Sequence, residues 1–137
     1  MPFLFPAEPR VLVVDDSVVV RRVLALTLRQ LPEFLYAEIE EAGNGAIALK
    51  KMAAGRYDLV MSDIRMPLMD GLEFVRRVRQ EQGDAATPIV LISTLGSEDD
   101  VRRGLEAGAT GYILKPLSPH LIKGWLRRFM DGLGDGA

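Results

Sequence analysis

The stretch MSDIRMPLMDGLEF, residues 61–74, decides the fold assignment. It continues a short apolar run, Leu59–Ser62, turns polar at Asp63, and passes through a loop with proline and glycine into an amphipathic segment, Leu72–Gln80. A short apolar run bounded by turn residues is typical of a buried strand, and apolar residues recurring every three or four positions are typical of a helix. The stretch therefore predicts a strand, a loop and a helix, with an aspartate where the strand ends.

The same alternation recurs on both sides of this stretch. Four further strands are expected at Arg10–Val14, Tyr36–Glu41, Ile89–Ile92 and Tyr112–Leu114. The other helices are expected from the cap Ser17 to a stop at Pro32, from the cap Asn44 to Gly55, and over Asp99–Ala107 and Pro119–Met130. Five strands alternating with five helices predict an α/β fold, a parallel sheet with helices on both faces and right-handed crossovers.

Apolar spacing also predicts which helix faces are buried, and local motifs predict helix ends. The expected buried stripes are Val20, Val23, Leu24, Thr27, Leu28 and Leu31 in the first helix, Ile47, Ala48, Leu49 and Met52 in the second, and Phe74, Val75 and Val78 in the third. Ser97 with Asp100 predicts a capping box, and Gly108 the end of the helix that it opens.

Composition limits the function classes. A chain of 137 residues suits one domain, and its net charge of −2 gives no electrostatic case for binding nucleic acid or an anionic membrane. The absence of cysteine excludes disulfides and thiolate metal sites. No apolar run could span a bilayer, and the N-terminus does not resemble a signal peptide, so a cytoplasmic protein is expected. The expected division is an N-terminal extension 1–9, a domain 10–131 and a flexible tail 132–137.

At every expected strand end except the second, a polar residue suited to chemistry follows an apolar run. These residues are Asp15 and Asp16, Asp63, Ser93 and Thr94, and Lys115. Because sites in open parallel sheets form beyond the carboxyl ends of the strands, we expect these side chains to converge. Three close carboxylates favour a cation, and an all-oxygen ligand set suits Mg²⁺. An aspartate nucleophile with a metal, a lysine and a hydroxyl predicts phosphoryl transfer to a carboxylate.

Four motifs in this order and spacing resemble the response-regulator receiver family. They are VLVVDDS at 11–17, MSDIRMPLMDGLEF at 61–74, PIVLIST at 88–94 and GATGYILKP at 108–116. The resemblance runs from about Val11 to Met130 and is greatest to the single-domain chemotaxis regulators. It implies a flavodoxin-like, CheY-like fold with strand order 2-1-3-4-5, and a place in a two-component phosphorelay.

The resemblance implies a role for each matching residue. Asp63 is the implied phosphoacceptor, and Asp15, Asp16, Asp63 and the backbone carbonyl of Arg65 are the implied ligands of Mg²⁺, or of Mn²⁺. The remaining implied roles are phosphoryl contacts for Lys115, Ser93 and Thr94, a switch formed by Ser93 and Tyr112, a cis peptide bond before Pro116, and a structural loop glycine at Gly71.

The resemblance also implies partners. A histidine kinase or histidine phosphotransfer domain would supply the phosphoryl group, and the surface of the fourth helix, fifth strand and fifth helix would bind a downstream protein. The chain would be a signalling phosphoprotein rather than an enzyme, a monomer or weak dimer, with no membrane or nucleic-acid contact of its own. The acidic start of the fourth helix, Glu98–Asp100, argues against binding to a flagellar motor.

Several alternatives remain open at this stage. The chain could be the receiver part of a longer regulator, a phosphatase with an aspartate nucleophile, or a binding module that is never phosphorylated. Asp15 and Asp16 could merely cap a helix. His120 is expected at the surface, and the four arginine pairs, at 21–22, 76–77, 102–103 and 127–128, are expected on solvated helix faces.

Overall fold

The structure, a computed structural model, describes residues 5–116 and 118–131. Over these residues strands and helices alternate. The bounds are β1 Arg10–Val14, α1 Val18–Leu28, η1 Pro32–Phe34 (a short 3-10 helix), β2 Glu38–Ala42, α2 Gly45–Ala54, β3 Leu59–Asp63, α3 Gly71–Gln80, β4 Ile89–Ser93, α4 Glu98–Ala107, β5 Gly111–Leu114 and α5 Pro119–Asp131. The predicted alternation is confirmed. The tail expected at 132–137 lies outside the described residues.

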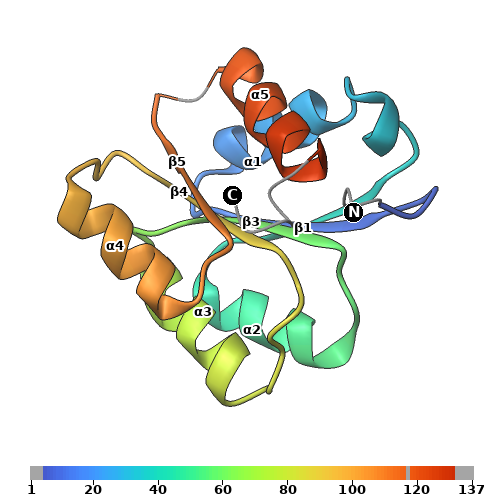
Figure 1. Cartoon of the computed structure of the whole chain (residues 1–137). Helices are drawn as coiled ribbons and strands as arrows, with labels where there is room; N and C mark the ends of the chain where they lie inside the picture. The colour runs from blue at the N-terminus through green and yellow to red at the C-terminus, as the bar shows by residue number, and fades with distance from the viewer. Residues whose placement is uncertain (1–4, 117, 132–137) are drawn as a thin grey trace.

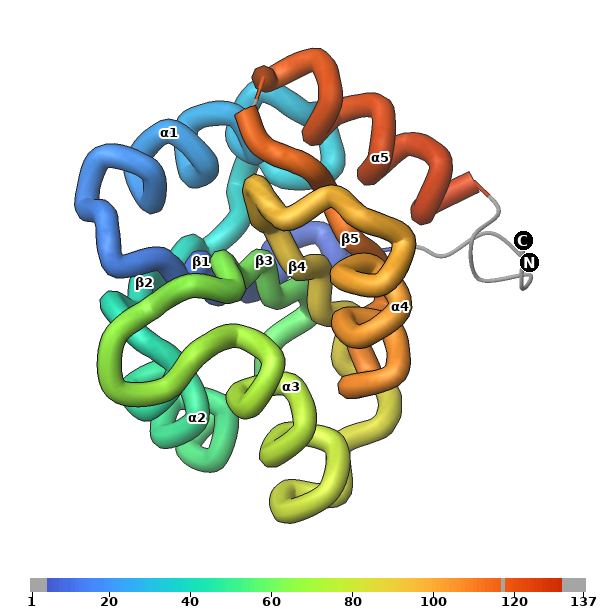
Figure 2. Tube along the Cα trace, turned by 90° about the vertical axis from the view of Figure 1, so that its left-hand side faces the viewer, coloured from blue at the N-terminus to red at the C-terminus, as the bar shows by residue number. Residues whose placement is uncertain are grey.

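The strands form one parallel sheet in the order β2-β1-β3-β4-β5, as the resemblance implied. Helices α1 and α5 cover one face, and α2, α3 and α4 cover the other (Figure 1). Figure 2 looks along the strands, so that the strand labels form a row between the helices on the two faces of the sheet. No helix in the described part of the chain is long and apolar enough to cross a membrane.

The core has two halves, one on each face of the sheet. Along β1, Val11 and Val13 face α1 and α5, whereas Leu12 and Val14 face α2 and α3. All four side chains are fully buried. A strand covered on both faces has no polar side, which is why β1, β3 and β4 read as continuous apolar runs in the sequence.

The expected second strand, Tyr36–Glu41, is wrong at both ends. The structure pairs Glu38–Ala42 with Arg10–Val14 of β1, and Tyr36 lies outside the strand with 72% of its surface exposed. Because β2 is an edge strand and is rich in glutamate, its apolar pattern is weak, and its limits follow from the length of β1 rather than from its own residues.

Two expected buried helix positions are wrong. Val23 on α1 is 44% exposed and Ile47 on α2 is 43% exposed, whereas the stripe expected on α3 is fully buried. Periodicity predicts which face of a helix turns toward the sheet but not how wide the buried part of that face is. On α1 and α2 the buried part is narrower than expected. Helices α3 and α4 also begin one residue earlier than expected, directly after the capping residues Asp70 and Ser97.

Candidate functional site

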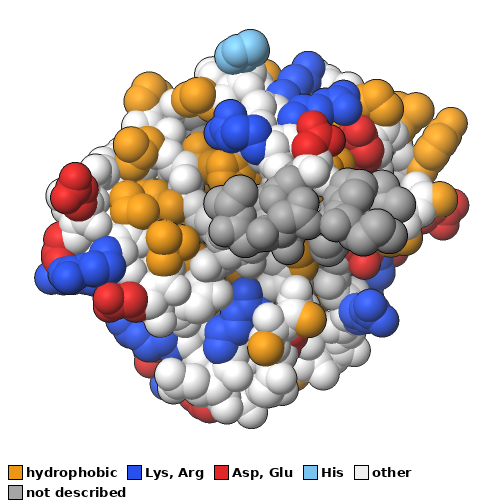
Figure 3. All heavy atoms as spheres, viewed as in Figure 1, with side chains coloured by type: hydrophobic (Ala, Val, Ile, Leu, Met, Phe, Trp, Pro, Cys, Tyr) orange, Lys and Arg blue, Asp and Glu red, His pale blue; other side chains and the backbone are white. Residues whose placement is uncertain are grey.

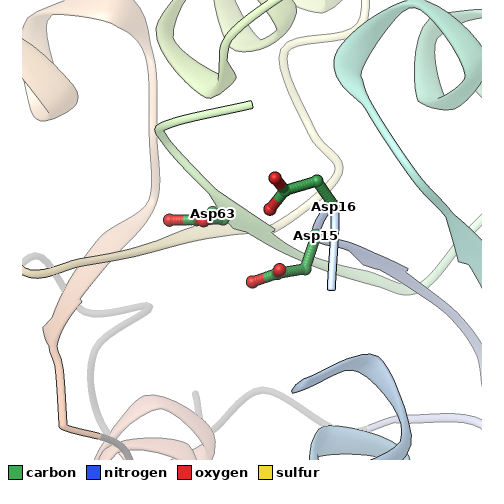
Figure 4. A group of neighbouring side chains, drawn as sticks. All are labelled: Asp15, Asp16 and Asp63. Atoms are coloured by element: carbon green, nitrogen blue, oxygen red, sulfur yellow. The ribbon is translucent and has the colours of Figure 1, made fainter. Parts of the chain in front are cut away.

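Three carboxylates meet at one edge of the sheet. Asp15 and Asp16 directly follow β1, Asp63 is the last residue of β3, and these two strands are neighbours. One carboxylate oxygen from each residue lies within 4.8 Å of the others, and Figure 4 shows the three groups on the same side of the strand ends. Asp15 and Asp63 are buried, while Asp16 is exposed. These are all-oxygen donors at a spacing that one divalent cation could share.

The carboxylate of Asp15 is held by the backbone and surrounded by charge. Its Oδ1 accepts a hydrogen bond of 2.8 Å from the backbone N–H of Ser17. Burial raises the pKa of Asp15, and the neighbouring charges of Asp63 and Asp16 raise it further, while the Ser17 N–H and Lys115 oppose the shift. A nearby cation stabilises the charged form of such a carboxyl group. Lys115 gives part of that stabilisation, but the pKa of Asp15 stays raised.

Lys115 supplies the nearest positive charge. Its Nζ lies 3.4 Å from Oδ2 of Asp63 and 3.6 Å from Oδ2 of Asp15. The other oxygen of Asp63, Oδ1, accepts a hydrogen bond of 2.8 Å from the backbone N–H of Ile64. The two oxygens of Asp63 are therefore distinct: Oδ1 is held by the backbone, and Oδ2 faces an ammonium group. The Lys115–Pro116 peptide bond is cis.

Ser93 lies beside Asp63, and Thr94 lies further out. The register pairs Asp63 with Ile92, which places Ser93 one residue further along β4. The Ser93 side chain is buried, and its Oγ accepts a hydrogen bond of 3.0 Å from the backbone N–H of Leu95. Because Oγ acts as an acceptor there, its own proton can be donated to another group. Thr94 is exposed at the rim.

Tyr112 links β5 to the loop before α4. Its hydroxyl donates a hydrogen bond of 2.6 Å to the carbonyl of Leu95. The ring packs against α4 at Gly104, where an added Cβ would lie 2.9 Å from Cδ2 of Tyr112. The sequence pointed to Tyr112 but not to its contacts with Leu95 and Gly104, because neither residue has a side-chain feature that marks such a contact.

Arg21 is the functional-site neighbour that the sequence misassigned. It was expected on a solvated helix face together with Arg22, and the structure confirms this for Arg22 alone. The Arg21 side chain is only 14% exposed, and its Nη1 donates a hydrogen bond of 2.6 Å to the backbone carbonyl of Asp15. Its partner Glu41 comes from β2, so no local pattern could have revealed the contact. His120 is exposed, as expected.

Two surface hollows adjoin these elements. One, of about 570 Å³, lies beside the acidic residues and is lined by Asp16, Ile64, Arg65, Met66, Pro67, Asp70, Leu72 and Leu95. The other, also of about 570 Å³, lies on α4 and is lined by Gly96, Glu98, Val101, Arg102, Leu105 and Glu106. Each is lined by both apolar and charged residues.

Comparison with known proteins gives consistent matches. Residues 11–127 match the response regulator receiver domain family. The transcriptional regulatory protein ResD of Bacillus subtilis (strain 168) is 40% identical over 125 residues, which cover 88% of this chain and 49% of ResD. The chemotaxis protein CheY1 of Helicobacter pylori is 37% identical over 115 residues, which cover 83% of this chain and 90% of CheY1. The chain thus spans about half the length of one relative and nearly all of the other.

Solved structures agree with these matches. Chemotaxis protein CheY4 of Vibrio cholerae is 36% identical, with a TM-score of 0.79 over 90% of this chain and 99% of CheY4. A CheX-CheY-BeF3-Mg²⁺ complex from Borrelia burgdorferi includes a chain that is 31% identical, with a TM-score of 0.79 over 89% of this chain and 87% of that one.

Proposed function

The chain belongs to the response regulator receiver domain family, and from that membership we propose that it is a phosphoacceptor switch in which Asp63 takes the phosphoryl group. One observation carries the proposal: Oδ2 of Asp63 lies 3.4 Å from the Lys115 ammonium, within a cluster of three carboxylates. A structural ion pair would not need two further acids beside it. A phosphoryl acceptor that works with a divalent cation would need these acids as ligands of the cation.

The residues present fit Mg²⁺. The side chains of Asp15, Asp16 and Asp63, with the backbone carbonyl of Arg65, would hold the ion, and the three carboxylates already group closely enough to share it. The all-oxygen donor set is the chemistry that Mg²⁺ prefers. When bound, the ion neutralises negative charge on the phosphoryl group and on the acids.

The transfer step uses this chain's own groups as follows. Oδ2 of Asp63 attacks the phosphorus of a phosphohistidine on a histidine kinase or histidine phosphotransfer domain. A P–O bond forms, the P–N bond breaks, and the imidazole nitrogen keeps the electron pair. The Ile64 N–H fixes Oδ1 and so orients the carboxylate, and Lys115 pairs with the phosphoryl oxygens as charge develops.

The switch would then pass from the site to the surface. The Ser93 hydroxyl donates a hydrogen bond to the new phosphoryl group, and the loop that contains Leu95 moves with it, together with Tyr112. The elements α4, β5 and α5 would present this change to a downstream protein. Leu105, Leu114 and Leu121 on these elements are each about half exposed. Figure 3 views this face, with hydrophobic side chains gathered where α4 and β5 lie.

Radiolabelled acetyl phosphate with Mg²⁺ tests the assignment. Wild-type protein should take up about one phosphoryl group per chain, and Asp63→Asn should take up none, because only a carboxylate can form the acyl phosphate. Asp70→Asn is the matched control, since Asp70 is a nearby acid that caps α3 through Glu73 N–H, and asparagine caps equally well. Stoichiometric labelling of Asp63→Asn would refute the proposal.

A second candidate concerns the extent of the protein. The chain covers 49% of ResD and 13% of a gliding motility regulatory protein of Myxococcus xanthus that is 38% identical over the matched residues. A receiver that is part of a longer regulator would match such relatives in this way. Sequencing the gene beyond both ends of the chain decides whether the receiver stands alone or is part of a longer regulator. A pull-down with and without beryllofluoride identifies a separate downstream protein.

A further inference from the structure

Arg21 connects the acidic site to a strand that contributes no side chain to it. Its Nη1 donates to the carbonyl of Asp15 at 2.6 Å, and its Nε donates to Oε1 of Glu41 at 2.9 Å. Glu41 lies near the end of β2, the strand end for which the sequence predicted no functional residue. The guanidinium thus bridges the start of the β1–α1 loop and the end of β2, with only 14% of the side chain exposed.

The backbone of Asp15 is held by β2 at its N–H and by Arg21 of α1 at its carbonyl. Its N–H donates to the carbonyl of Ala42 at 3.1 Å, and its own carbonyl accepts from Arg21. That carbonyl belongs to the peptide group that joins Asp15 to Asp16. Because a peptide group is planar, fixing its carbonyl limits the directions in which both acidic side chains leave the backbone.

We infer that Arg21, held by Glu41, is a positioning residue that fixes the peptide between Asp15 and Asp16 and thereby sets the affinity of the acidic cluster for a divalent cation. The inference rests on the proposed function, because it assumes that the cluster binds a cation. It assigns a role to the end of β2 and to the partly buried Arg21–Glu41 ion pair, which the transfer step itself does not use.

Geometry, rather than charge, is what Arg21 supplies. Its positive charge is already paired with Glu41, and its planar fork places two donors at fixed angles toward two acceptors on different elements. A lysine in its place keeps the charge, but its single ammonium group cannot reproduce that fork. Arg21→Lys should therefore resemble Arg21→Ala rather than the wild type.

Arg22 is the matched control that the chain provides. It is the next residue of α1 and pairs with the other oxygen of Glu41, Nε to Oε2 at 2.9 Å. Its side chain is 68% exposed, and its described hydrogen bond goes to Glu41 and not to Asp15. Arg22→Ala removes the same charge from the same ion-pair network and leaves the contact with Asp15 in place.

Calorimetric titration of the full chain with MgCl₂ is the central experiment. Arg21→Ala and Arg21→Lys should each bind Mg²⁺ at least about tenfold more weakly than wild type, the size of loss seen when a group that orients a metal ligand is removed. Glu41→Gln should weaken binding in the same direction, and Arg22→Ala should stay within about twofold of wild type. Circular dichroism of each variant checks that the fold is retained.

Hydrogen exchange in metal-free protein supplies a readout that does not depend on bound Mg²⁺. The amides of Asp16 and Ser17 should exchange faster in Arg21→Ala and Arg21→Lys than in Arg22→Ala, while the amides in the centre of α1 should not. If Arg21→Ala does not fold, Arg21→Lys and Glu41→Gln provide the same comparison.

The outcomes separate this inference from the proposed function. Mg²⁺ affinity within about twofold of wild type in Arg21→Ala overturns the inference. An equal loss in Arg22→Ala also overturns it, because that variant keeps the contact with Asp15. A wild-type protein that binds no Mg²⁺ and takes no label on Asp63 overturns the proposed function instead. Normal wild-type labelling, with Mg²⁺ binding weakened in the Arg21 variants and in Glu41→Gln but not in Arg22→Ala, supports both.

Discussion

At the scale of single residues, the site depends on how each carboxylate oxygen is engaged. Asp63 has one oxygen on a backbone N–H and the other near an ammonium group, and Asp15 has the same division between Ser17 and Lys115. Asp15 and Asp63 are therefore each oriented by the main chain and compensated by Lys115, the residue that follows β5. This arrangement holds two buried carboxylates side by side, at the cost of a raised pKa for Asp15.

Gly71 is the residue that keeps the loop after β3 close to Asp63. Its N–H donates to the carbonyl of Ile64 at 2.8 Å, and a Cβ at this position would lie 2.3 Å from the carbonyl oxygen of Asp63. Gly71→Ala should lower the free energy of unfolding by about 1–3 kcal/mol, because the clash is with backbone that cannot rotate away. It should also slow labelling of Asp63. Urea unfolding and acetyl phosphate labelling measure the two effects.

Gly124 on α5 gives the opposite case and serves as the control. An added Cβ there would meet only Nη1 of Arg128, at 3.6 Å, and alanine favours a helix more than glycine does. Gly124→Ala should raise the free energy of unfolding by up to about 1 kcal/mol and leave labelling unchanged. Equal effects of the two substitutions would show that Gly71 is not required for the close approach.

At the scale of elements, the loop between α3 and β4 is organised by one carboxylate. Asp84 accepts hydrogen bonds from the backbone N–H groups of Ala86 and Thr87 and from the Thr87 hydroxyl. Burial opposes ionisation, but these bonds and the charge of Arg79 outweigh it and lower the pKa of Asp84. The ionised side chain therefore stabilises the folded state.

The lowered pKa predicts how stability depends on pH. The stabilisation by Asp84 is complete above the pKa of the unfolded chain and is lost as the pH falls through the lower pKa of the folded state. Asp84→Asn should reduce the free energy of unfolding by about 1–2 kcal/mol near neutral pH, and the difference from wild type should shrink in acid. Urea unfolding over a pH series measures it.

Glu81→Gln is the control for this pH series. Glu81 precedes the same loop, but its side chain is 62% exposed and its distance to Arg77 is 3.4 Å. Exposed pairs of this kind add little to stability, so its difference from wild type should be small at every pH. A loss in Asp84→Asn that is independent of pH would contradict the assigned cause.

At the scale of the whole molecule, the first described residues pack against the last described helix, α5. The ring of Phe5 lies 4.8 Å from that of Phe34 in η1 and 6.2 Å from that of Phe129 in α5, and Phe129 stacks on Trp125 at 5.3 Å. Pro9 also accepts a hydrogen bond from the N–H of Glu38. We therefore propose that residues 5–9 of the expected extension 1–9 belong to the folded domain.

Phe5→Ala tests this assignment. It should lower the free energy of unfolding by about 1–3 kcal/mol, less than for a fully buried phenylalanine because Phe5 is partly exposed. The emission of Trp125, the single tryptophan, should change because its stacking partner Phe129 loses a neighbour. Leu26→Ala on α1, where the side chain is 64% exposed, should have little effect on either quantity. Equal stability of Phe5→Ala and wild type would leave the segment outside the domain.

The sequence alone was sufficient for the elements that have strong local signals. The runs at Arg10–Val14 and Ile89–Ile92 identified central strands, because a strand buried on both faces is apolar throughout, and the Ser97 capping box marked the start of α4. The acids Asp15, Asp16 and Asp63 could be expected to meet, because parallel strands end at the same edge of the sheet. Their assignment to phosphoryl transfer came from the residue types and from the resemblance.

Only the tertiary structure decided the limits of β2, the exposure of Val23, and the position of Arg21 between Asp15 and Glu41. These features depend on residues that are distant in the chain and meet through strand pairing. Periodicity and capping are local, so the sequence could fix which groups each strand end presents. Which neighbour holds those groups depends on the register between strands, and that register exists only once the sheet has formed.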